Sequence, residues 1–253
     1  MKTLKILGIK ISVLDSYLTA YNFIQRELKN GTPDYVVVNN VHTVIEGVRN
    51  KRYMAAIDNA CLSFPDGKPL SFYAKLRGEK NISRIFGPTF MEKTLDWSQK
   101  DSISHYFFGS SLETLDKMKE VINSKYLAIV ICGMASPPFK KFTEEENKLF
   151  LKQMNESGAD IFWIGLGAPK QEIWMYENYK KLNHGIMIGI GAGFDYLAGN
   201  TKHAPEWMKN MALEWLYRLI QEPRRLWKRY LITNSLFLYY IFLEMTGLRK
   251  FDK

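Results

Sequence analysis

The sequence predicts an α/β protein of Rossmann-like type, with a largely parallel sheet flanked by helices and a basic helical C-terminal appendage. Short apolar runs such as residues 161–164 end in glycines, which is typical of buried parallel strands. These runs alternate with amphipathic stretches of about 10 to 15 residues, the pattern of a sheet with helices on both faces. Strand patterns stop near residue 204. We therefore expect an α/β core over residues 1–203 and the appendage over residues 204–253.

The composition is that of a globular, basic protein. Hydrophobic residues make up 46% of the 253, enough to fill a sizeable core, and the formal net charge is +9. From residue 201 onward, ten Lys and Arg stand against five Asp and Glu, so just over half of the net charge lies in this last part. This excess indicates an anionic partner such as phosphate, a membrane surface or nucleic acid.

Cysteines and the N-terminus indicate the compartment. Cys61 and Cys132 form no C-x-x-C pair and both lie in apolar stretches, which favours free thiols in a reducing compartment over a disulfide. Residues 1–12 are basic but alternate in hydropathy, without the apolar core or cleavage site of a signal peptide. We expect a cytoplasmic protein.

The first elements are read from period and capping residues. Residues 4–11 alternate with period two and predict an edge strand, and Asp15 or Ser16 then caps a helix that Gly31 ends. The next expected elements are a strand at 35–38, two short helices over 41–59, a strand at 61–64, helices over 69–77 and from 89, a strand at 103–109, a helix over 111–123, a strand at 127–133 and a helix from Thr143 to Gly158, opened by a capping box.

Residues 160–199 organise the rest of the chain. The strand at 161–164 runs into a glycine loop, after which Pro169 is expected at the first position of a helix, where its missing N–H costs nothing. The loop, including Gly167, would then leave free backbone amides at the positive end of the helix dipole. This predicts a phosphate site.

A second unit of the same kind follows. The strand at 186–190 ends in Gly191 and Gly193, with Asp195 just beyond. Loops that follow neighbouring parallel strands lie together at the carboxyl edge of the sheet, where α/β proteins bind their ligands. We therefore expect both glycine loops to border one site.

The glycines do not match a dinucleotide-binding motif, and the histidines do not match a metal site. Gly189-x-Gly191-x-Gly193 lacks the third glycine of the G-x-G-x-x-G dinucleotide fingerprint, which is Phe194 here. It also neither follows an early strand nor precedes an acidic residue at the end of a second strand about 20 positions later. A nicotinamide or flavin enzyme is therefore disfavoured. The four histidines, His42, His105, His184 and His203, show no metal-ligand spacing, so no metal site is expected.

Two polar positions follow strands in the first half of the chain. Asn40, after the strand at 35–38, could cap the next helix or face a ligand, and the residues leave both alternatives open. Pro65-Asp66-Gly67 is in its ordinary reading a tight turn.

Five ordered motifs carry a family resemblance. They are Phe64-Pro65-Asp66-Gly67, Gly167-x-Pro169-x-Gln171-Glu172, Gly191-x-Gly193-Phe194-Asp195-x-x-Ala198-Gly199, Ala204-Pro205-x-Trp207-Met208 and Leu213-Glu214-Trp215-Leu216-Tyr217-Arg218-Leu219-x-x-Glu222-Pro223-x-Arg225. Over roughly residues 4–230 the chain resembles the WecG/TagA/CpsF family of bacterial glycosyltransferases.

The resemblance implies an activity and its partners. The family transfers a sugar, typically of the N-acetylmannosamine type, from a UDP-sugar to a polyprenyl-diphosphate-linked sugar at the inner face of the cytoplasmic membrane. Transfer proceeds with inversion and without a metal or other cofactor. Its members serve teichoic acid, enterobacterial common antigen, and capsule or exopolysaccharide synthesis, so the sequence leaves the donor sugar and the pathway open.

The resemblance also implies site residues. Asp66 matches the proposed general base, Arg84 an arginine near the donor diphosphate, and Asn40 and Gln171 pocket positions. Gly167, Gly191 and Asp195 belong to the shared glycine motifs and are expected at the substrate site. Val38 stands where some members have a threonine, so a hydroxyl contact from there is not expected.

The basic tail has two readings. The family resemblance places Arg218, Arg225 and Lys228 on basic positions of an appendage that closes over the active site. Lys228 is usually arginine there, and the neighbouring Arg229 could replace it in gripping a phosphate. The alternative is a solvated basic helix face. A nucleic-acid-binding module without transferase activity would also explain the basic and aromatic tail, but not the glycine loops.

An apolar stripe extends the tail. Residues 236–243 are too few to span a bilayer. An apolar set at helical spacing beside the basic cluster suits an interfacial helix, although packing onto the protein's own core or onto a second copy of the chain explains it equally well. The stripe consists of Trp227, Leu231, Leu238, Ile241, Met245 and Leu248.

Overall fold

The computed structural model describes residues 1–251, apart from the side chain of Asn210. At its centre lies a six-stranded sheet in the order β4-β3-β8-β7-β5-β6, in which every neighbouring pair is parallel. The strands are β3 (Asp34–Asn39), β4 (Leu62–Pro65), β5 (Ser104–Gly109), β6 (Val130–Ala135), β7 (Ile161–Gly165) and β8 (Ile186–Gly189). The predicted Rossmann-like α/β class is confirmed.

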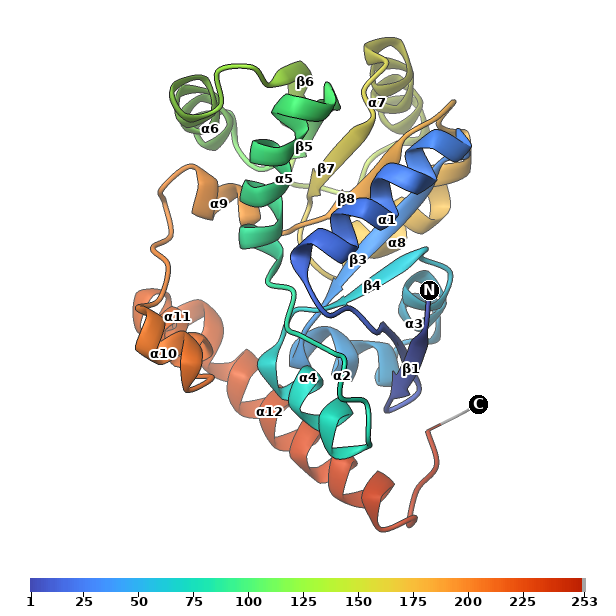
Figure 1. The fold of residues 1–253 in the computed structure, drawn as a ribbon, viewed down its shortest axis with the longest axis vertical. Coiled ribbons are helices and arrows are strands. Elements are labelled where there is room, and N and C mark those ends of the chain that lie inside the picture. The colour runs from blue at the N-terminus through green and yellow to red at the C-terminus, as the bar shows by residue number, and fades with distance from the viewer. Residues whose placement is uncertain (252–253) are drawn as a thin grey trace.

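Helices cover both faces of this sheet (Figure 1). Those of the core are α1 (Tyr17–Asn30), α2 (Val41–Arg49), α3 (Lys51–Asp58), α4 (Lys68–Leu76), α5 (Gly87–Asp101), α6 (Leu112–Lys125), α7 (Glu144–Ser157), α8 (Lys170–Asn178), the 3-10 turn η1 (Tyr179–Lys181) and α9 (Gly193–Leu197). After residue 203 follow α10 (Glu206–Asn210), α11 (Glu214–Gln221) and α12 (Pro223–Met245). Several expected caps form. Ser16 caps α1, and Thr143 opens α7 with a capping box.

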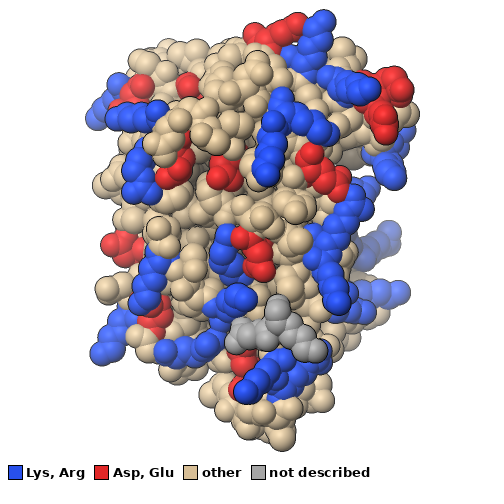
Figure 2. Space-filling model, turned by 90° about the vertical axis from the view of Figure 1, so that its right-hand side faces the viewer, with Lys and Arg blue, Asp and Glu red and all other residues tan. Residues whose placement is uncertain are grey.

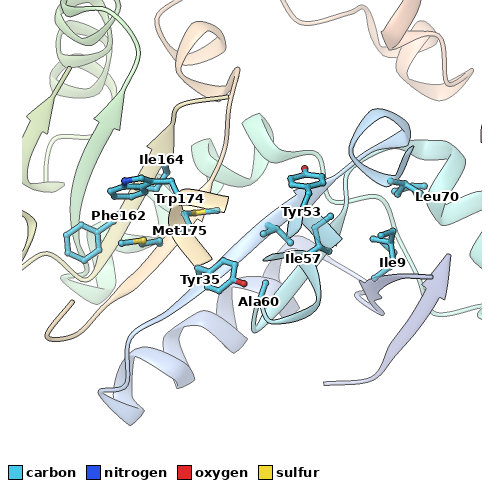
Figure 3. Close-up of a cluster of buried hydrophobic side chains, with 14 of the residues drawn as sticks. Ile9, Tyr35, Tyr53, Ile57, Ala60, Leu70, Phe162, Ile164, Trp174 and Met175 are labelled. Atoms are coloured by element: carbon cyan, nitrogen blue, oxygen red, sulfur yellow. The ribbon is translucent and has the colours of Figure 1, made fainter. Parts of the chain in front are cut away.

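Successive strand residues point to opposite faces and divide the core in two. On β7, Phe162 and Ile164 join one buried cluster, whereas Ile161 and Trp163 join the other. The first cluster packs under α2, α3, α7 and α8, and the second under α1, α5, α6 and α9. Figure 3 shows part of the first, in which Tyr35 of the sheet lies between residues of α3 and α8.

Two local predictions were wrong. The edge strand expected over residues 4–11 is a hairpin of β1 (Thr3–Ile6) and β2 (Ile9–Ser12), because Leu7 and Gly8 turn the chain with positive φ angles of 51° and 78°. The strand expected at 127–133 begins only at Val130, which pairs with Ser104 at the start of β5. Leu127 lies before that ladder and is 87% exposed.

The C-terminal helices fold back onto the core. Helix α12 runs beside α2 and α4 and buries Leu226, Thr233 and Phe237 (Figure 1). Its far end is held where the Tyr73 hydroxyl of α4 donates to Glu244 at 2.7 Å. Within the described chain, we find no helix with both the length and the apolarity that a membrane span requires. The two cysteines are unpaired and half-buried.

Candidate active site

A cavity of about 490 Å³ lies at the carboxyl ends of β3 and β4 and is roofed by α11 and α12. It brings together four of the residues that the sequence predicts for the site, namely Asn40, Asp66, Arg84 and Arg218. The remaining wall is partly basic and largely apolar. It includes His42, Pro69, Glu214, Trp215, Leu226, Arg229, Tyr230, Thr233, Asn234, Phe237 and Leu238.

Asp66 is the first residue after β4. Its backbone N–H donates to the carbonyl of Asn39 on the neighbouring strand at 2.8 Å, and its Oδ1 accepts from the Gly87 N–H at the start of α5, also at 2.8 Å. The side chain is 9% exposed. Burial raises its pKa to about 6, against the opposing effect of the Arg84 charge. At neutral pH the carboxylate therefore predominates, and it is basic enough to accept a proton.

Arg84 links the Asp66 loop to the C-terminal helices. Its Nε donates to the Asp66 carbonyl at 2.5 Å, and its Nη1 lies 2.6 Å from Oε2 of the buried Glu214, as an ion pair without good hydrogen-bond geometry. The guanidinium also lies over the Phe86 ring, 4.5 Å from its centroid. The arginine is thus held with its charge against the cavity, and Glu214 supplies the counter-charge.

Arg218 of α11 is the second cation beside Asp66. It pairs with Glu222 at 3.4 Å and lies over the Tyr196 ring, 5.6 Å from its centroid. Its Nε is buried without a hydrogen-bond partner among the described residues. A buried donor without a partner is costly, so this nitrogen is suited to an anionic ligand oxygen.

Asn40 caps the next helix, one of the two alternatives that its position allowed. Its Oδ1 caps α2 by accepting from the N–H groups of His42 and Thr43 at 3.0 and 3.2 Å, and the residue also lines the cavity. The cap fixes the first turn of α2, which brings His42 to the cavity wall. Burial, and to a lesser degree the charge of Arg229, lowers the pKa of His42 to about 4, so its ring is neutral at physiological pH.

The glycine loop after β7 differs from the prediction. Pro169 stands at the N-cap position after a cis peptide bond, and α8 begins at Lys170. The loop amides are not all free, because the Gly167 N–H donates to Oε1 of Gln171 at 3.1 Å. Gly167 and Gly191 both have positive φ angles, of 78° and 52°, which a glycine adopts without strain.

Gln171 is buried beneath this loop, at 3% exposure. While its Oε1 accepts from Gly167, its Nε2 donates to Oε1 of Glu172 at 2.8 Å. Glu172 is 1% exposed, and burial raises its pKa to about 7. The pair forms a buried polar network that holds the loop, and Gln171 does not line the Asp66 cavity.

Five further predicted residues lie outside the cavity, and two of them are Gly167 and Gly191 of the glycine loops. Asp195, on α9, borders a separate hollow of about 390 Å³ with Asn200, Thr201, Gln221 and Glu222. Arg225 and Lys228 are exposed on α12, where Arg225 pairs with Glu222 and Lys228 lies over the Trp227 ring. The structure therefore brings Arg229, and not Lys228, to the cavity wall.

A larger cavity, of about 530 Å³, opens at the carboxyl ends of β5 and β7, beside α7 and α8. Its wall includes Lys140, Phe142, Lys170 and Trp174, and none of the residues predicted for the site. We take the Asp66 cavity as the candidate active site, because it joins a buried carboxylate of raised pKa to two arginines.

Sequence reasoning assigned no role to Glu214 and Tyr230, and named Arg229 only as a substitute. Glu214 was within reach, since it lies inside the quoted motif of the tail. Arg229 and Tyr230 share a helix face with Leu226 and Thr233 at the three- and four-residue spacing of a helix. Once one cavity residue of α12 is known, this spacing predicts that Arg229 and Tyr230 line the cavity as well.

Comparison with known proteins identifies the family of this chain. The sequence profile described as "Glycosyl transferase WecG/TagA/CpsF family" matches residues 4–251. The chain is 27% identical over 224 residues to an N-acetylglucosaminyldiphosphoundecaprenol N-acetyl-beta-D-mannosaminyltransferase of Bacillus spizizenii, covering 88% of this chain and 85% of the relative. It is 29% identical over 193 residues to the enzyme of the same name from Bacillus subtilis, covering 76% and 73%.

The match spans nearly the whole chain, so this protein belongs to the WecG/TagA/CpsF family, and it is a glycosyltransferase. The family resemblance seen in its motifs is confirmed.

Proposed function

We propose that this enzyme transfers an N-acetylmannosamine-type sugar from a UDP-sugar to a polyprenyl-diphosphate-linked N-acetylglucosamine, with inversion at the anomeric carbon. The observation that carries the proposal is the Asp66 cavity, in a chain whose two relatives are named for N-acetylmannosaminyl transfer to N-acetylglucosaminyldiphosphoundecaprenol. The product would be a disaccharide on the lipid carrier, an intermediate of cell-surface polysaccharide synthesis such as teichoic acid or exopolysaccharide.

In this mechanism Asp66 is the general base. Its carboxylate takes the proton of the acceptor hydroxyl as that oxygen attacks the anomeric carbon from the side opposite the leaving diphosphate. The C–O bond to the diphosphate breaks as the new glycosidic bond forms, which inverts the configuration. A pKa of about 6 suits this task, because the group is largely ionised at neutral pH yet more basic than an exposed aspartate.

The leaving UDP needs positive charge. Arg84 donates to the Asp66 carbonyl and Arg218 lines the same cavity, and the buried Nε of Arg218, which has no partner among the described residues, suits a phosphate oxygen. Arg225 and Lys228 are proposed to reach the donor only after α11 and α12 rearrange around it. With guanidinium groups in this role, we expect turnover without a divalent metal. Activity that disappears in EDTA and returns with Mg²⁺ or Mn²⁺ would overturn that part.

The decisive experiment is a panel of UDP-sugars with a short-chain prenyl-diphosphate-linked N-acetylglucosamine, with the product mass as readout. We expect the mass of one N-acetylhexosamine to be added with UDP-N-acetylmannosamine, and proton coupling at the new anomeric centre to report inversion. Turnover of a different UDP-sugar would correct the donor. Absence of turnover with every donor would sink the proposed function.

We also propose that the enzyme docks at the inner face of the cytoplasmic membrane through α12. Leu231, Phe242 and Met245 on this helix are exposed, whereas Ile241 packs on the core. An exposed apolar stripe beside lysines and arginines fits an interfacial helix, and each cation near an anionic surface contributes about 1 kcal/mol. Figure 2 shows another face of the molecule, on which basic and acidic residues are interspersed.

Point substitutions test the docking better than truncation, because α12 also buries Phe237 in the core. The triple variant Leu231→Ser, Phe242→Ser, Met245→Ser should lose binding to anionic vesicles and keep turnover of a soluble acceptor. The matched control Leu112→Ser, Leu127→Ser removes exposed apolar residues elsewhere. Wild-type protein that does not bind the vesicles would contradict the docking. A triple variant with a changed oligomeric state would show that the stripe is an interface between protein chains.

A further inference from the structure

Arg229 is a half-buried cation that forms no ion pair among the described residues, although the carboxylate of Glu46 on α2 acts on it from a longer distance. It lies in the wall of the Asp66 cavity, and its guanidinium makes no hydrogen bond or ion pair with any residue that the structure describes. The other cavity arginines differ, since Arg84 pairs with Glu214 and Arg218 with Glu222. Burial, followed by the charge of Arg225, lowers the pKa of Arg229. An unpaired charge in such a place is costly until an anion joins it.

His42 adds a second unsatisfied group to the same part of the cavity. Its Nδ1 is buried and has no hydrogen-bond partner among the described residues, and α2, which carries His42, packs against α12, which carries Arg229. The acidic residues in the cavity wall are Asp66 and Glu214, and Glu214 is paired with Arg84. A guanidinium without an ion-pair partner and an imidazole without a hydrogen-bond partner in one cavity wall can together bind an anion.

The wall beyond Arg229 is apolar. Along α12 the cavity residues run in the order Leu226, Arg229, Tyr230, Thr233, Asn234, Phe237 and Leu238. Leu238 stands nine positions after Arg229, a rise of about 13 Å along the helix axis. Asp66 lies toward the other end, beside Arg84, which donates to the Asp66 carbonyl and pairs with Glu214 at the start of α11. The cavity therefore presents a base, then cationic groups, then an apolar wall that ends at an exposed leucine.

We propose that Arg229, with His42 beside it, binds the diphosphate of the lipid-linked acceptor and so positions the acceptor sugar at Asp66, while Phe237 and Leu238 contact the first prenyl units. This inference rests on the proposed function and assigns the acceptor to one end of its cavity. A sugar, a diphosphate and an apolar chain follow one another in the acceptor in the order in which the cavity presents base, cation and apolar wall. The donor lacks that order, since its diphosphate leads to a polar nucleoside.

Binding measurements separate the two diphosphates. We would titrate geranyl diphosphate and, separately, UDP into wild type, Arg229→Gln, Arg229→Lys and the control Arg249→Gln by calorimetry. Arg249 is an exposed arginine after α12 and does not line the cavity, so the control loses the same charge. For Arg229→Gln we expect geranyl diphosphate to bind about 10- to 100-fold more weakly, the effect of losing a charge-assisted hydrogen bond, and UDP binding to stay within about twofold.

Steady-state kinetics supply the second readout. Arg229→Gln should raise the KM for the prenyl-diphosphate-linked acceptor and leave the donor KM unchanged. Arg229→Lys should recover part of the affinity, because it keeps the charge and loses the bidentate fork. If Arg229→Gln fails to fold, this lysine variant decides alone, with a loss of about 3- to 10-fold expected for geranyl diphosphate only.

Two results would overturn the inference. One is a loss of UDP affinity that equals or exceeds the loss for geranyl diphosphate. The other is a wild-type enzyme that transfers sugar yet does not bind geranyl diphosphate, which leaves the proposed function standing. Wild-type enzyme that binds geranyl diphosphate through Arg229 but uses no sugar donor would instead support the anion site and sink the proposed function.

Discussion

The carboxyl edge of the sheet carries two buried carboxylic acids, and the regions around them differ. Asp66 follows β4 and Glu172 lies in α8 after β7, and burial raises the pKa of both, to about 6 and about 7. Asp66 faces a cavity with Arg84 and Arg218, whereas Glu172 is sealed against Gln171 and close to Tyr53. Burial alone therefore does not mark a catalytic group, and access together with nearby cations distinguishes the two sites.

The first prediction tests the role of Asp66, the buried acid that faces the cavity. Asp66→Asn keeps the shape and can still accept from the Gly87 N–H, but it removes the base, so kcat should fall about 10²- to 10⁴-fold. Donor affinity should stay nearly constant in a calorimetric titration with UDP. Asp195→Asn, which changes an acid outside the cavity, is the control. Near-normal turnover by Asp66→Asn would remove Asp66 from the role and bring Asp195 forward.

The second prediction concerns the sealed region. Glu172→Ala leaves Nε2 of Gln171 without its acceptor in a buried site, so the free energy of unfolding should drop by about 1 to 3 kcal/mol. Glu172→Gln retains an acceptor oxygen and should unfold closer to wild type. Denaturant titration measures both, and kcat of the folded Gln variant should stay within a few-fold of wild type. A loss of kcat as large as that of Asp66→Asn would mean that Glu172 takes part in the chemistry.

The third prediction uses the two pKa values. The general base must be deprotonated, and the pKa of Asp66 is raised to about 6, so kcat/KM should fall about tenfold between pH 7 and pH 5. Glu172→Gln should keep this acid limb of the profile, because the titrating group is in the other region. If the acid limb of the pH profile shifts or disappears in Glu172→Gln, the titrating group is Glu172.

The smallest expected effect is on stability. The folded-state pKa of Asp66 lies above its unfolded value near 4, so between about pH 4 and pH 6 the folded state still holds a proton that the unfolded state has released. The folded protein therefore loses stability as pH rises through that range. Asp66→Asn removes this penalty, so the variant should be about 1 to 2 kcal/mol more stable than wild type at pH 8. Thermal unfolding at pH 8 and pH 4 checks it, and a difference that persists at pH 4 contradicts the electrostatic origin.

Much of the fold follows from local chemistry. Period and capping residues predicted α1 and α7, and apolar runs ending in glycine predicted β7 and β8. The errors arose where a tertiary contact decides. The first segment reads as one strand until the turn at Leu7 and Gly8 is known, and β6 begins where its register with β5 starts.

For the site, the family motifs in the amino-acid sequence predicted Asp66 and Arg218, and the family resemblance outside those motifs predicted Arg84. Asp66 could also be placed at the carboxyl edge of the sheet from the sequence, because it directly follows a strand and parallel strands end at one edge. Only the tertiary structure decided that Gln171 is sealed with Glu172 and that Arg229 faces the cavity in place of Lys228. Successive residues of a helix point about 100° apart, so the docking of α12 against α2 selects the cation that meets the ligand.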